Sequence, residues 1–502
     1  MTADRDRGTR EALLAEIKAS GTLSGLPTGH FINGRQVPSV QGRMMESYDP
    51  GRGAVFAQFA AGDAADVDHA VTTAKKAFRQ TWRKVKPAER GRILMRAADL
   101  VRRDAVRLAV IESLDSGKRL VEAEGDVRSV IRCLEYYAGA ADKLQGASLP
   151  LGPDYVGFTV EEPVGVAAQI IPWNYPISTA MRGIAPALAA GCAVVAKPAE
   201  QTPFTALLLA ELLHEAGLPD GVLNVVTGRG AEAGAALVAH PDVDHITFTG
   251  SVTTGINVMQ SAATNVTRVL LELGGKSPVV VLKDSNLDAA VQGVIEAIYE
   301  NAGQICSAGS RLVIERAVQN EFLDRLVKRV SGLTLGHGLS NPDIGPVNSL
   351  AQLQKIDRHV VAARSAGNVI HIGGRIAADA ELGGGWYFQP TIISSRGISD
   401  PLVQEEIFGP VLTVQTASDL DEAIALANGT DFALVAGIYT RDLSKAYRFA
   451  NEVDAGQVYI NEYFAGGIEV PFGGNRKSGF GREKGLEGLK SYCQVKSVVT
   501  RL

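Results

Sequence analysis

The sequence is poor in cysteine and histidine, and the scarcity of both limits the chemistry it can carry. Four cysteines in a chain of 502 residues cannot form a disulfide framework, and none belongs to a Cys-x-x-Cys pair. No histidine stands at metal-ligand spacing from a cysteine, so we expect no metal site. We expect a reducing, cytoplasmic environment, in which a functional cysteine acts through its thiol.

The sequence also lacks an excess of one charge and a long hydrophobic segment. The net charge is −5 with acids and bases interspersed, so no electrostatic feature for nucleic acid is present. The longest apolar run, Ile184 to Ala196, is too short to span a bilayer and contains Pro186 and Gly191. The N-terminal segment MTADRDRGTREALLAEIKAS alternates in charge without an apolar core, so we expect no secretory signal and no membrane partner.

What remains is the composition of a soluble globular protein with more than one core. Hydrophobic residues make up 46% of the chain and charged residues 21%, and the length allows two or three domains. Residues 1–25 are charged and uneven, and we expect a loosely held arm there. Two amphipathic helices are predicted next, one in AADVDHAVTTAKKAFRQTW and one over about residues 88–115, ending at DSGK.

From about residue 164, short runs rich in valine and isoleucine alternate with stretches of helix length. The runs are VGVAAQII, CAVVAKP, VLNVVTG, HITFTG and RVLLELGG. Such continuous apolar runs are typical of parallel strands buried on both faces, which predicts an α/β sheet. The pattern resumes with PVVVL, RLVIE, LVAGIYT and GQVYIN, which predicts a second α/β unit after about residue 273.

Two further segments, VGFTVEEP and YCQVKSVVTRL, are predicted to be strands outside both sheets. Exposed strands of this kind often pair with another subunit, so both segments favour a homo-oligomer.

The segment LELGGKSP, Leu271 to Pro278, ends like a phosphate-binding P-loop, but that interpretation fails. Counting back five positions from Gly275 gives Leu270, inside a predicted strand, where a P-loop needs a glycine. A better phosphate site is FTGSVTTG, in which a strand ends before Gly250 and Ser251 and a helix follows. A helix N-terminus beside a glycine accepts pyrophosphate, although a strand-to-helix turn without a ligand explains the same pattern.

Cys306 differs from the other three cysteines in its surroundings. The segment NAGQICSAGSR places small residues on both sides of it, which leaves room for a substrate at the thiol. A buried structural thiol is the alternative, and it is our interpretation of Cys133, Cys192 and Cys493. A cysteine hydrolase would need a histidine base, and none of the eight histidines is an obvious partner. This shortage favours a carboxylate base.

Taken together, these segments resemble the aldehyde dehydrogenase superfamily along nearly the whole chain. The matching blocks occur in the family's order and at about its spacing: IIPWNYP, VVAKPAEQTP, FTGS, LELGGKSP, GQICSAGSR, EEIFGPV and PFGGNRKSGFGRE. The resemblance implies a Rossmann-like NAD-binding domain (residues 1–137 and 161–272) and a second α/β catalytic domain (residues 273–479). It also implies a small β oligomerisation element (residues 138–160 and 480–502) and a homodimer or homotetramer.

By this resemblance Cys306 is the nucleophile, Glu272 the catalytic carboxylate and Asn174 an oxyanion donor beside the Cys306 backbone amide. The thiolate attacks the aldehyde carbon to form a thiohemiacetal, and hydride transfer to the nicotinamide leaves a thioester. Glu272 then activates the water that hydrolyses the thioester. Relatives that pass the acyl group to coenzyme A generally lack this glutamate, so a free carboxylic acid is the expected product.

The resemblance also implies a nicotinamide dinucleotide site formed by Ile171, Trp173, Lys197, Glu200, Gly250, Ser251, Leu273, Glu406 and Phe408. Lys197 and Glu200 match the positions that hold the adenine ribose. A carboxylate accepts hydrogen bonds from ribose hydroxyls but repels a 2′-phosphate, so Glu200 favours NAD over NADP, which Lys197 still allows. Trp173 is expected to line the adenine-side route, with a core position as the alternative.

Two neighbouring positions depart from the family's pattern. Gly183 stands where many members have a lysine that serves a proton relay, whereas the relay glutamate is kept as Glu483. Arg182 shares a predicted helical face with Tyr175 and with Ser178 or Thr179, and this face lines the substrate tunnel in the family. Arginine there resembles the semialdehyde dehydrogenases, in which it meets a substrate carboxylate, and some enzymes of aromatic aldehydes carry it too.

Glu300, Ile305 and Tyr463 complete the expected tunnel, and Glu300 argues against an anionic substrate. It either pairs with Arg182 or favours a cationic aldehyde held by Tyr175 and Tyr463.

We therefore expect an NAD-dependent aldehyde dehydrogenase that prefers an anionic or polar aldehyde, such as a semialdehyde or an aromatic aldehyde. An aminoaldehyde or betaine-aldehyde dehydrogenase is the alternative. A cofactor-independent cysteine esterase would use the same thiol, and NADH formation separates it from a dehydrogenase. A non-catalytic descendant would be expected to have lost Cys306, Glu272 or Asn174, and all three are present.

Overall fold

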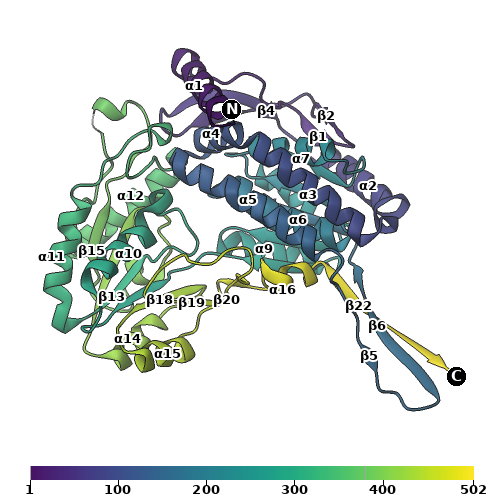
Figure 1. Cartoon of the computed structure of the whole chain (residues 1–502). Coiled ribbons are helices and arrows are strands. Elements are labelled where there is room, and N and C mark those ends of the chain that lie inside the picture. Colours follow the sequence, from purple (N-terminus) through teal and green to yellow (C-terminus); the bar gives the residue numbers. More distant parts are fainter. Residues whose placement is uncertain (1, 379) are drawn as a thin grey trace.

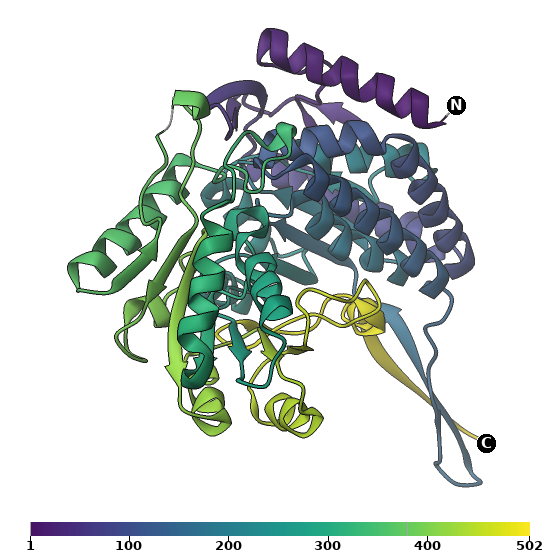
Figure 2. The ribbon, with the colours of Figure 1, turned by 60° about the vertical axis from the view of Figure 1, so that its left-hand side comes forward.

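The computed structural model describes residues 2–378 and 380–502 and begins with a helix that the sequence did not suggest (Figure 1). Helix α1 (Thr2–Ser20) occupies the segment for which a loosely held arm is predicted, so that prediction is wrong. The physical reason is a small apolar stripe: Leu13 and Ile17 lie one turn apart and pack against the main core. Figure 2 shows α1 along the edge of the molecule, beside the helices that follow it.

The predicted amphipathic helices are present, but the second is broken. The first is α2 (Ala64–Gln80). Asp104 separates α3 (Pro87–Arg103) from α4 (Ala105–Ser116), so the single helix predicted over residues 88–115 is wrong. The backbone of Asp104 leaves the helical region, at φ −102° and ψ 12°, and its carboxylate accepts hydrogen bonds from Arg103. Helix α4 ends at Gly117, and α5 (Leu120–Ala140) packs against both α3 and α4.

The first large sheet contains the predicted valine-rich runs as parallel strands. In spatial order its strands are β2 (Arg35–Val37), β1 (His30–Ile32), β9 (Leu223–Val225), β8 (Ala193–Pro198), β7 (Val166–Ile171), β10 (His245–Thr249), β11 (Arg268–Glu272) and β21 (Gly479–Phe480). The five strands from β9 to β11 are parallel, and the others are antiparallel to their neighbours. Helices α6 (Pro176–Ala190), α7 (Phe204–Glu215), α8 (Ala235–Val238) and α9 (Val252–Ala263) connect them.

The second large sheet confirms the second α/β unit. In spatial order its strands are β14 (Val369–Ile372), β15 (Thr391–Ser394), β16 (Val411–Ala417), β13 (Arg311–Glu315), β12 (Pro278–Val281), β18 (Val435–Tyr439) and β19 (Gln457–Ile460). All pairs are parallel except β14 with β15. The accompanying helices are α10 (Leu287–Tyr299), α11 (Gln319–Val330), α12 (Leu350–Ser365), α13 (Pro401–Gln404), α14 (Leu420–Ala427) and α15 (Leu443–Glu452).

A three-stranded arm projects from the body, as Figure 1 shows. Strand β6 (Tyr155–Pro163) pairs antiparallel with β22 (Cys493–Arg501) over its whole length, and β5 (Ser148–Leu149) lies on its other edge. The two strands predicted outside both sheets are therefore confirmed. The exact domain boundaries stay a prediction.

Shorter elements complete the fold. They are the pair β3 (Met44–Asp49) and β4 (Ala54–Ala60), the pair β17 (Phe432–Ala433) and β20 (Asn475–Arg476), and helix α16 (Gly485–Lys490). In the part of the chain that the structure describes, no helix combines the length and apolar character needed to cross a bilayer.

Candidate active site

The predicted phosphate turn has the expected strand–turn–helix geometry. Strand β10 ends at Thr249, and α9 begins at Val252 with Ser251 as its N-cap. The Ser251 hydroxyl accepts a hydrogen bond from the Thr254 backbone N–H, and the Gly250 N–H donates to the Glu272 carbonyl oxygen at 3.0 Å. The helix N-terminus and the Glu272 strand end are therefore held side by side.

The LELGGKSP segment carries the chain from the first sheet into the second. Glu272 is the last residue of β11, and β12 begins at Pro278. A Cβ on Gly274 would lie 2.2 Å from Glu406 Oε2, and a Cβ on Gly275 would lie 2.6 Å from the Cys306 carbonyl oxygen. A side chain at either position would collide with these groups, so the two glycines allow the segment to pass close to them. The segment thereby brings Glu272, Glu406 and Cys306 near one another.

The Glu272 carboxyl group is buried and lacks a hydrogen-bond partner among the described residues. Its side chain is 2% exposed, and neither oxygen receives a hydrogen bond. Burial raises its pKa well above the usual range, the nearby Glu483 raises it further, and Arg182 lowers it. Once ionised, a carboxylate in this state accepts a proton more readily than an exposed one.

Cys306 follows a strained turn. After α10 the backbone of Asn301, Ala302 and Gly303 is left-handed, with φ of 46°, 53° and 72°. The Cys306 side chain is half-buried, and burial raises the pKa of its thiol to about 12. The thiol therefore needs a base to remove its proton, and the Glu272 carboxyl group lies in the same pocket.

Asn174 lies in the loop between β7 and α6 and is tied to the Cys306 loop. Its Nδ2 donates to the Gln304 carbonyl oxygen at 2.9 Å, and its backbone oxygen accepts from Asn301 Nδ2 at 3.0 Å. Both contacts fix the side-chain amide two residues from Cys306.

One pocket at the carboxyl ends of the first sheet's strands joins most of the predicted residues. It is lined by Pro172, Trp173, Asn174, Thr249, Gly250, Ser251, Glu272, Leu273, Gly274, Cys306, Gln352, Lys355, Glu406 and Phe408. This edge of an open parallel sheet is where ligands bind in α/β folds. Trp173 is part of this pocket rather than the core, with its ring 5.3 Å from that of Phe408 and perpendicular to it.

Three of the predicted cofactor residues lie outside this pocket, at the ends of neighbouring strands. Ile171 ends β7 and is buried. Lys197 lies in β8, and its amine is 3.5 Å from the Glu200 carboxylate, which also accepts from the Gly230 N–H at 3.3 Å. At the carboxyl end of β8 the Glu200 carboxylate is thus held by two donors, the Lys197 amine and the Gly230 N–H.

Two pocket residues, Gln352 and Lys355 on α12, were missed by sequence reasoning. Gln352 Nε2 donates to the backbone oxygens of Ile407 and Phe408, so it holds the loop that carries Glu406. On an amphipathic helix both side chains look like ordinary surface residues, and no signal in the sequence separates them from the rest.

The structure corrects the expected partner of Arg182. Its guanidinium lies 2.5 Å from the Glu483 carboxylate and over the Phe472 ring, and not beside Glu300. Glu300 instead lies near Glu122 and Asp126, and burial together with these two acids raises the pKa of Glu300 to about 7. The internal ion pair of Arg182 with Glu300 is therefore wrong.

The remaining tunnel residues lie on two sides of the Cys306 loop. Thr179 and Ile305 are buried. The Tyr175 ring has the Lys118 amine 4.0 Å from its centre, and its hydroxyl is 3.5 Å from Glu300. Tyr463 donates to the Ser307 carbonyl oxygen at 2.9 Å and packs among aromatic rings, so it supports the Cys306 loop from behind.

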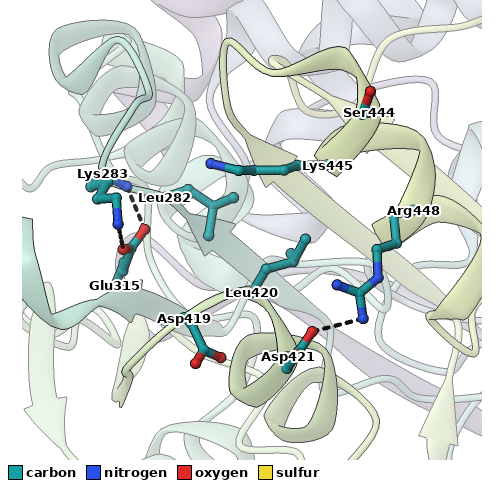
Figure 3. A pocket seen from close by; sticks show the side chains of 9 residues that line it. All are labelled: Leu282, Lys283, Glu315, Asp419, Leu420, Asp421, Ser444, Lys445 and Arg448. Carbon is teal, nitrogen blue, oxygen red and sulfur yellow. Dashed lines mark hydrogen bonds and ion pairs between the residues drawn. The ribbon is translucent and has the colours of Figure 1, made fainter.

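A second hollow lies at the carboxyl ends of strands β12 and β13 (Figure 3). Its charged groups satisfy one another: Lys283 pairs with Glu315 at 3.0 Å, and Arg448 pairs with Asp421 at 2.7 Å. It contains no cysteine, so the pocket with Cys306 is the candidate site.

Comparison with known proteins agrees with this geometry. Residues 37–498 match the aldehyde dehydrogenase family. Betaine aldehyde dehydrogenase of Bacillus subtilis is 41% identical, over 93% of this chain and 96% of that protein. Human mitochondrial aldehyde dehydrogenase is 41% identical, over 94% of this chain and 92% of that protein.

Among solved structures, betaine aldehyde dehydrogenase of Staphylococcus aureus in complex with NAD+ matches with a TM-score of 0.94 and 36% identity, over 99% of this chain and 97% of that one. The fold and site define an α/β oxidoreductase, and the chain belongs to the aldehyde dehydrogenase family. The predicted family, fold class and aldehyde dehydrogenase activity are thereby confirmed, and the predicted cofactor is the one bound in these neighbours.

Proposed function

We propose that this enzyme oxidises an aldehyde to its carboxylic acid with NAD, through Cys306 as nucleophile and Glu272 as base. One observation carries the proposal: a single pocket is lined by Cys306, Glu272 and Asn174 together with the turn at Gly250 and the Glu406 carboxylate. Nucleophile, base, oxyanion donor and cofactor residues thus converge on one space.

The Cys306 thiol and the Glu272 carboxyl group act as a proton donor and a proton acceptor. Because burial raises the pKa of both Cys306 and Glu272, the ionised form of Glu272 is a strong base for the buried thiol, and transfer of the thiol proton to that carboxylate produces the nucleophile. The attack forms a C–S bond and an oxyanion. Asn174 Nδ2, now bound to the Gln304 carbonyl, and the Cys306 backbone N–H are the donors for that oxyanion, and loss of one such donor costs about 10²–10³ in rate.

The residues present fit a dinucleotide. Ser251 caps α9, whose N-terminus suits a pyrophosphate, and the Glu406 carboxylate accepts from the Gly275 N–H at 2.9 Å, which fixes it for a ribose hydroxyl. When bound, NAD+ accepts the hydride from the substrate carbon. The Glu200 carboxylate accepts from ribose hydroxyls and repels a 2′-phosphate, which supports NAD over NADP.

Hydrolysis of the acyl-Cys306 thioester needs a base, and Glu272 supplies it. Its carboxylate takes a proton from water, the water oxygen attacks the thioester carbon, and the C–S bond breaks to give the acid and the Cys306 thiolate. The proton on Glu272 must then leave a buried site.

For the substrate, a neutral or cationic aldehyde is better supported than an anionic one. The Arg182 guanidinium is already paired with Glu483, whereas the Tyr175 side of the Cys306 loop faces acids. Three acidic side chains lie there near two basic ones: Glu300, Glu122 and Asp126 beside Lys118 and Arg119. The B. subtilis relative named for betaine aldehyde, a cationic substrate, points the same way.

The projecting arm supports a homo-oligomer. Apolar side chains on β6 and β22 are exposed, among them Tyr155, Phe158, Val495 and Val499, and the outer edge of β22 is free within the described chain. A second copy of the chain would cover them. Analytical ultracentrifugation tests this, because a Val495→Glu/Val499→Glu variant is expected to dissociate.

The test of function is NADH formation by the purified protein with matched aldehydes of positive, neutral and negative charge. We expect turnover with NAD to exceed turnover with NADP. The Glu200→Ser variant should have a smaller ratio of NAD-dependent to NADP-dependent turnover. Ester hydrolysis without NADH formation from any aldehyde would favour the esterase instead.

A further inference from the structure

Two cations share the ring of Phe472, and only one of them is paired. The Arg182 guanidinium lies 4.9 Å from the ring centre and binds the Glu483 carboxylate. The Lys484 amine lies 5.3 Å from the same centre, and no hydrogen bond or ion pair engages it among residues 2–378 and 380–502. We call Phe472, Arg182, Glu483 and Lys484 the Phe472 cluster.

The cluster adjoins the catalytic base. A Cβ placed on Gly473 would lie 2.7 Å from Glu272 Oε1, so the base sits against the backbone next to Phe472. Phe472 and Glu483 exchange two backbone hydrogen bonds of 2.8 Å. These bonds join the backbone beside Glu272 to the segment that carries Glu483 and Lys484. Glu272 therefore lies beside Glu483, and Lys484 is the next residue along the chain.

Helix α6 does not supply a lysine to this place. Gly183 has no side chain, and a Cβ there would lie 1.9 Å from Gln169 Nε2. Gln169 is buried and donates to the Tyr492 hydroxyl, so it fills the space firmly. A titratable group for the proton on Glu272 has to come from another element.

Lys484 reaches the cluster at a conformational cost. Its backbone, at φ 60° and ψ 176°, lies in a region that only glycine adopts freely. This backbone directs the side chain inward onto Phe472, while part of the residue stays in contact with solvent. The amine is thus close enough to the buried Glu483 carboxylate to interact with its charge, on a residue that is partly exposed.

We infer that Lys484 is the group through which the proton taken up by Glu272 leaves the site, by way of Glu483. This rests on the proposed function and assigns a positioning and proton-transfer role to a residue outside the pocket that holds Cys306.

The proton balance is simple. During deacylation Glu272 gains one proton from the attacking water. That proton passes to the Glu483 carboxylate and from there to the neutral amine of Lys484, which forms an N–H bond and becomes an ammonium. The ammonium releases the same proton to solvent, and all three groups return to their starting states.

The surroundings of Lys484 suit such a carrier. Burial and the charge of Arg182 lower its pKa to about 8, against the attraction of Glu483 and smaller effects of Cys133 and Cys306. The charge of Lys484 in turn lowers the pKa of Glu469 and that of Glu272. As pH rises through about 8 the amine becomes neutral and able to accept a proton, so turnover is expected to rise over that range.

The experiment compares wild type with Lys484→Met and Lys484→Ala in two reactions of Cys306: aldehyde oxidation, and hydrolysis of 4-nitrophenyl acetate without cofactor. Both end in hydrolysis of acyl-Cys306. We expect Lys484→Met to slow deacylation about 10²-fold, the lower end for a proton-transfer group, and to flatten the rise near pH 8. The first-turnover burst of NADH should keep its amplitude. Imidazole or methylamine should restore Lys484→Ala in a concentration-dependent manner and leave wild type unchanged.

Two variants separate this from a structural role. Lys490→Met removes an exposed amine from α16, the helix for which Lys484 is the N-cap, and no change is expected. Lys484→Gly removes the backbone strain along with the amine, so it should melt no lower than wild type yet be as slow as Lys484→Met.

Unchanged deacylation and pH dependence in Lys484→Met would overturn the inference. So would a raised KM confined to anionic aldehydes, since that would make Lys484 a substrate anchor. A wild type that forms no NADH contradicts the proposed function instead.

Discussion

The Arg182 guanidinium and the Glu483 carboxylate form an ion pair of 2.5 Å beside the buried carboxyl group of Glu272. Both partners are largely shielded from water, so the pair acts on its neighbours with little screening. The two partners act on Glu272 in opposite directions: Glu483 raises the pKa of its carboxyl group, and Arg182 lowers it.

The first prediction concerns removal of that charge. Arg182→Met leaves Glu483 buried without its partner and should cost about 3–5 kcal/mol of stability. It should also move the base-dependent limb of the kcat–pH profile to higher pH, because Arg182 lowers the pKa of Glu272. Arg182→Lys should restore most of both. A loss confined to carboxylate-bearing aldehydes would show instead that Arg182 binds substrate.

The second prediction concerns Glu272 itself. Glu272→Gln should lower turnover by about 10²–10⁴, the range for a general base. Because the folded pKa of Glu272 lies above its unfolded value, ionisation destabilises the fold as pH rises from the unfolded to the folded pKa. The melting temperature of Glu272→Gln should therefore gain on that of wild type as pH increases. Parallel melting curves across pH would contradict the burial of an ionisable group here.

The third prediction tests the packing behind Gly183. Since a Cβ there would lie 1.9 Å from Gln169, Gly183→Ala should destabilise by about 1–3 kcal/mol despite the better helix propensity of alanine. The double variant Gln169→Ala/Gly183→Ala should be less destabilised than the sum of the two single changes. Denaturant unfolding measures the coupling, and strict additivity would argue against direct contact.

The fourth prediction is a pH-dependent substrate preference. Burial, Glu122 and Asp126 raise the pKa of Glu300 to about 7, so Glu300 becomes charged as pH rises through 7. The ratio of kcat/KM for a cationic aldehyde to that for a neutral one of the same shape should increase about tenfold over this range, equivalent to about 1.4 kcal/mol. Glu300→Gln should flatten the ratio, whereas Glu296→Gln, an exposed acid on α10, should not. A ratio independent of pH in wild type would remove Glu300 from substrate recognition.

Sequence patterns predicted the two parallel sheets because the strands are continuous valine-rich runs ended by glycine, proline or polar turns. They failed where structure depends on a few contacts. Helix α1 is held by a short apolar stripe, Leu13 and Ile17, together with a few long-range contacts such as the ion pair between Arg10 and Glu124. The break between α3 and α4 comes from the backbone of one residue, Asp104.

For the site, the motifs predicted which residues converge but not their side-chain partners. Glu483 meets Arg182 only because β21 returns to the edge of the first sheet beside β11, a long-range pairing that no local pattern reports. Gln352 and Lys355 escaped notice because helix α12 resembles any amphipathic surface helix until Phe408 lies against it.

The most direct test of the central claim is NADH formation by wild type and Cys306→Ala with NAD and a neutral aldehyde, beside NAD binding by both proteins. The account predicts NADH from wild type, none above background from Cys306→Ala, and equal NAD binding, because the thiol reacts while other residues of its pocket hold the cofactor. NADH formation by Cys306→Ala at the wild-type rate would contradict it.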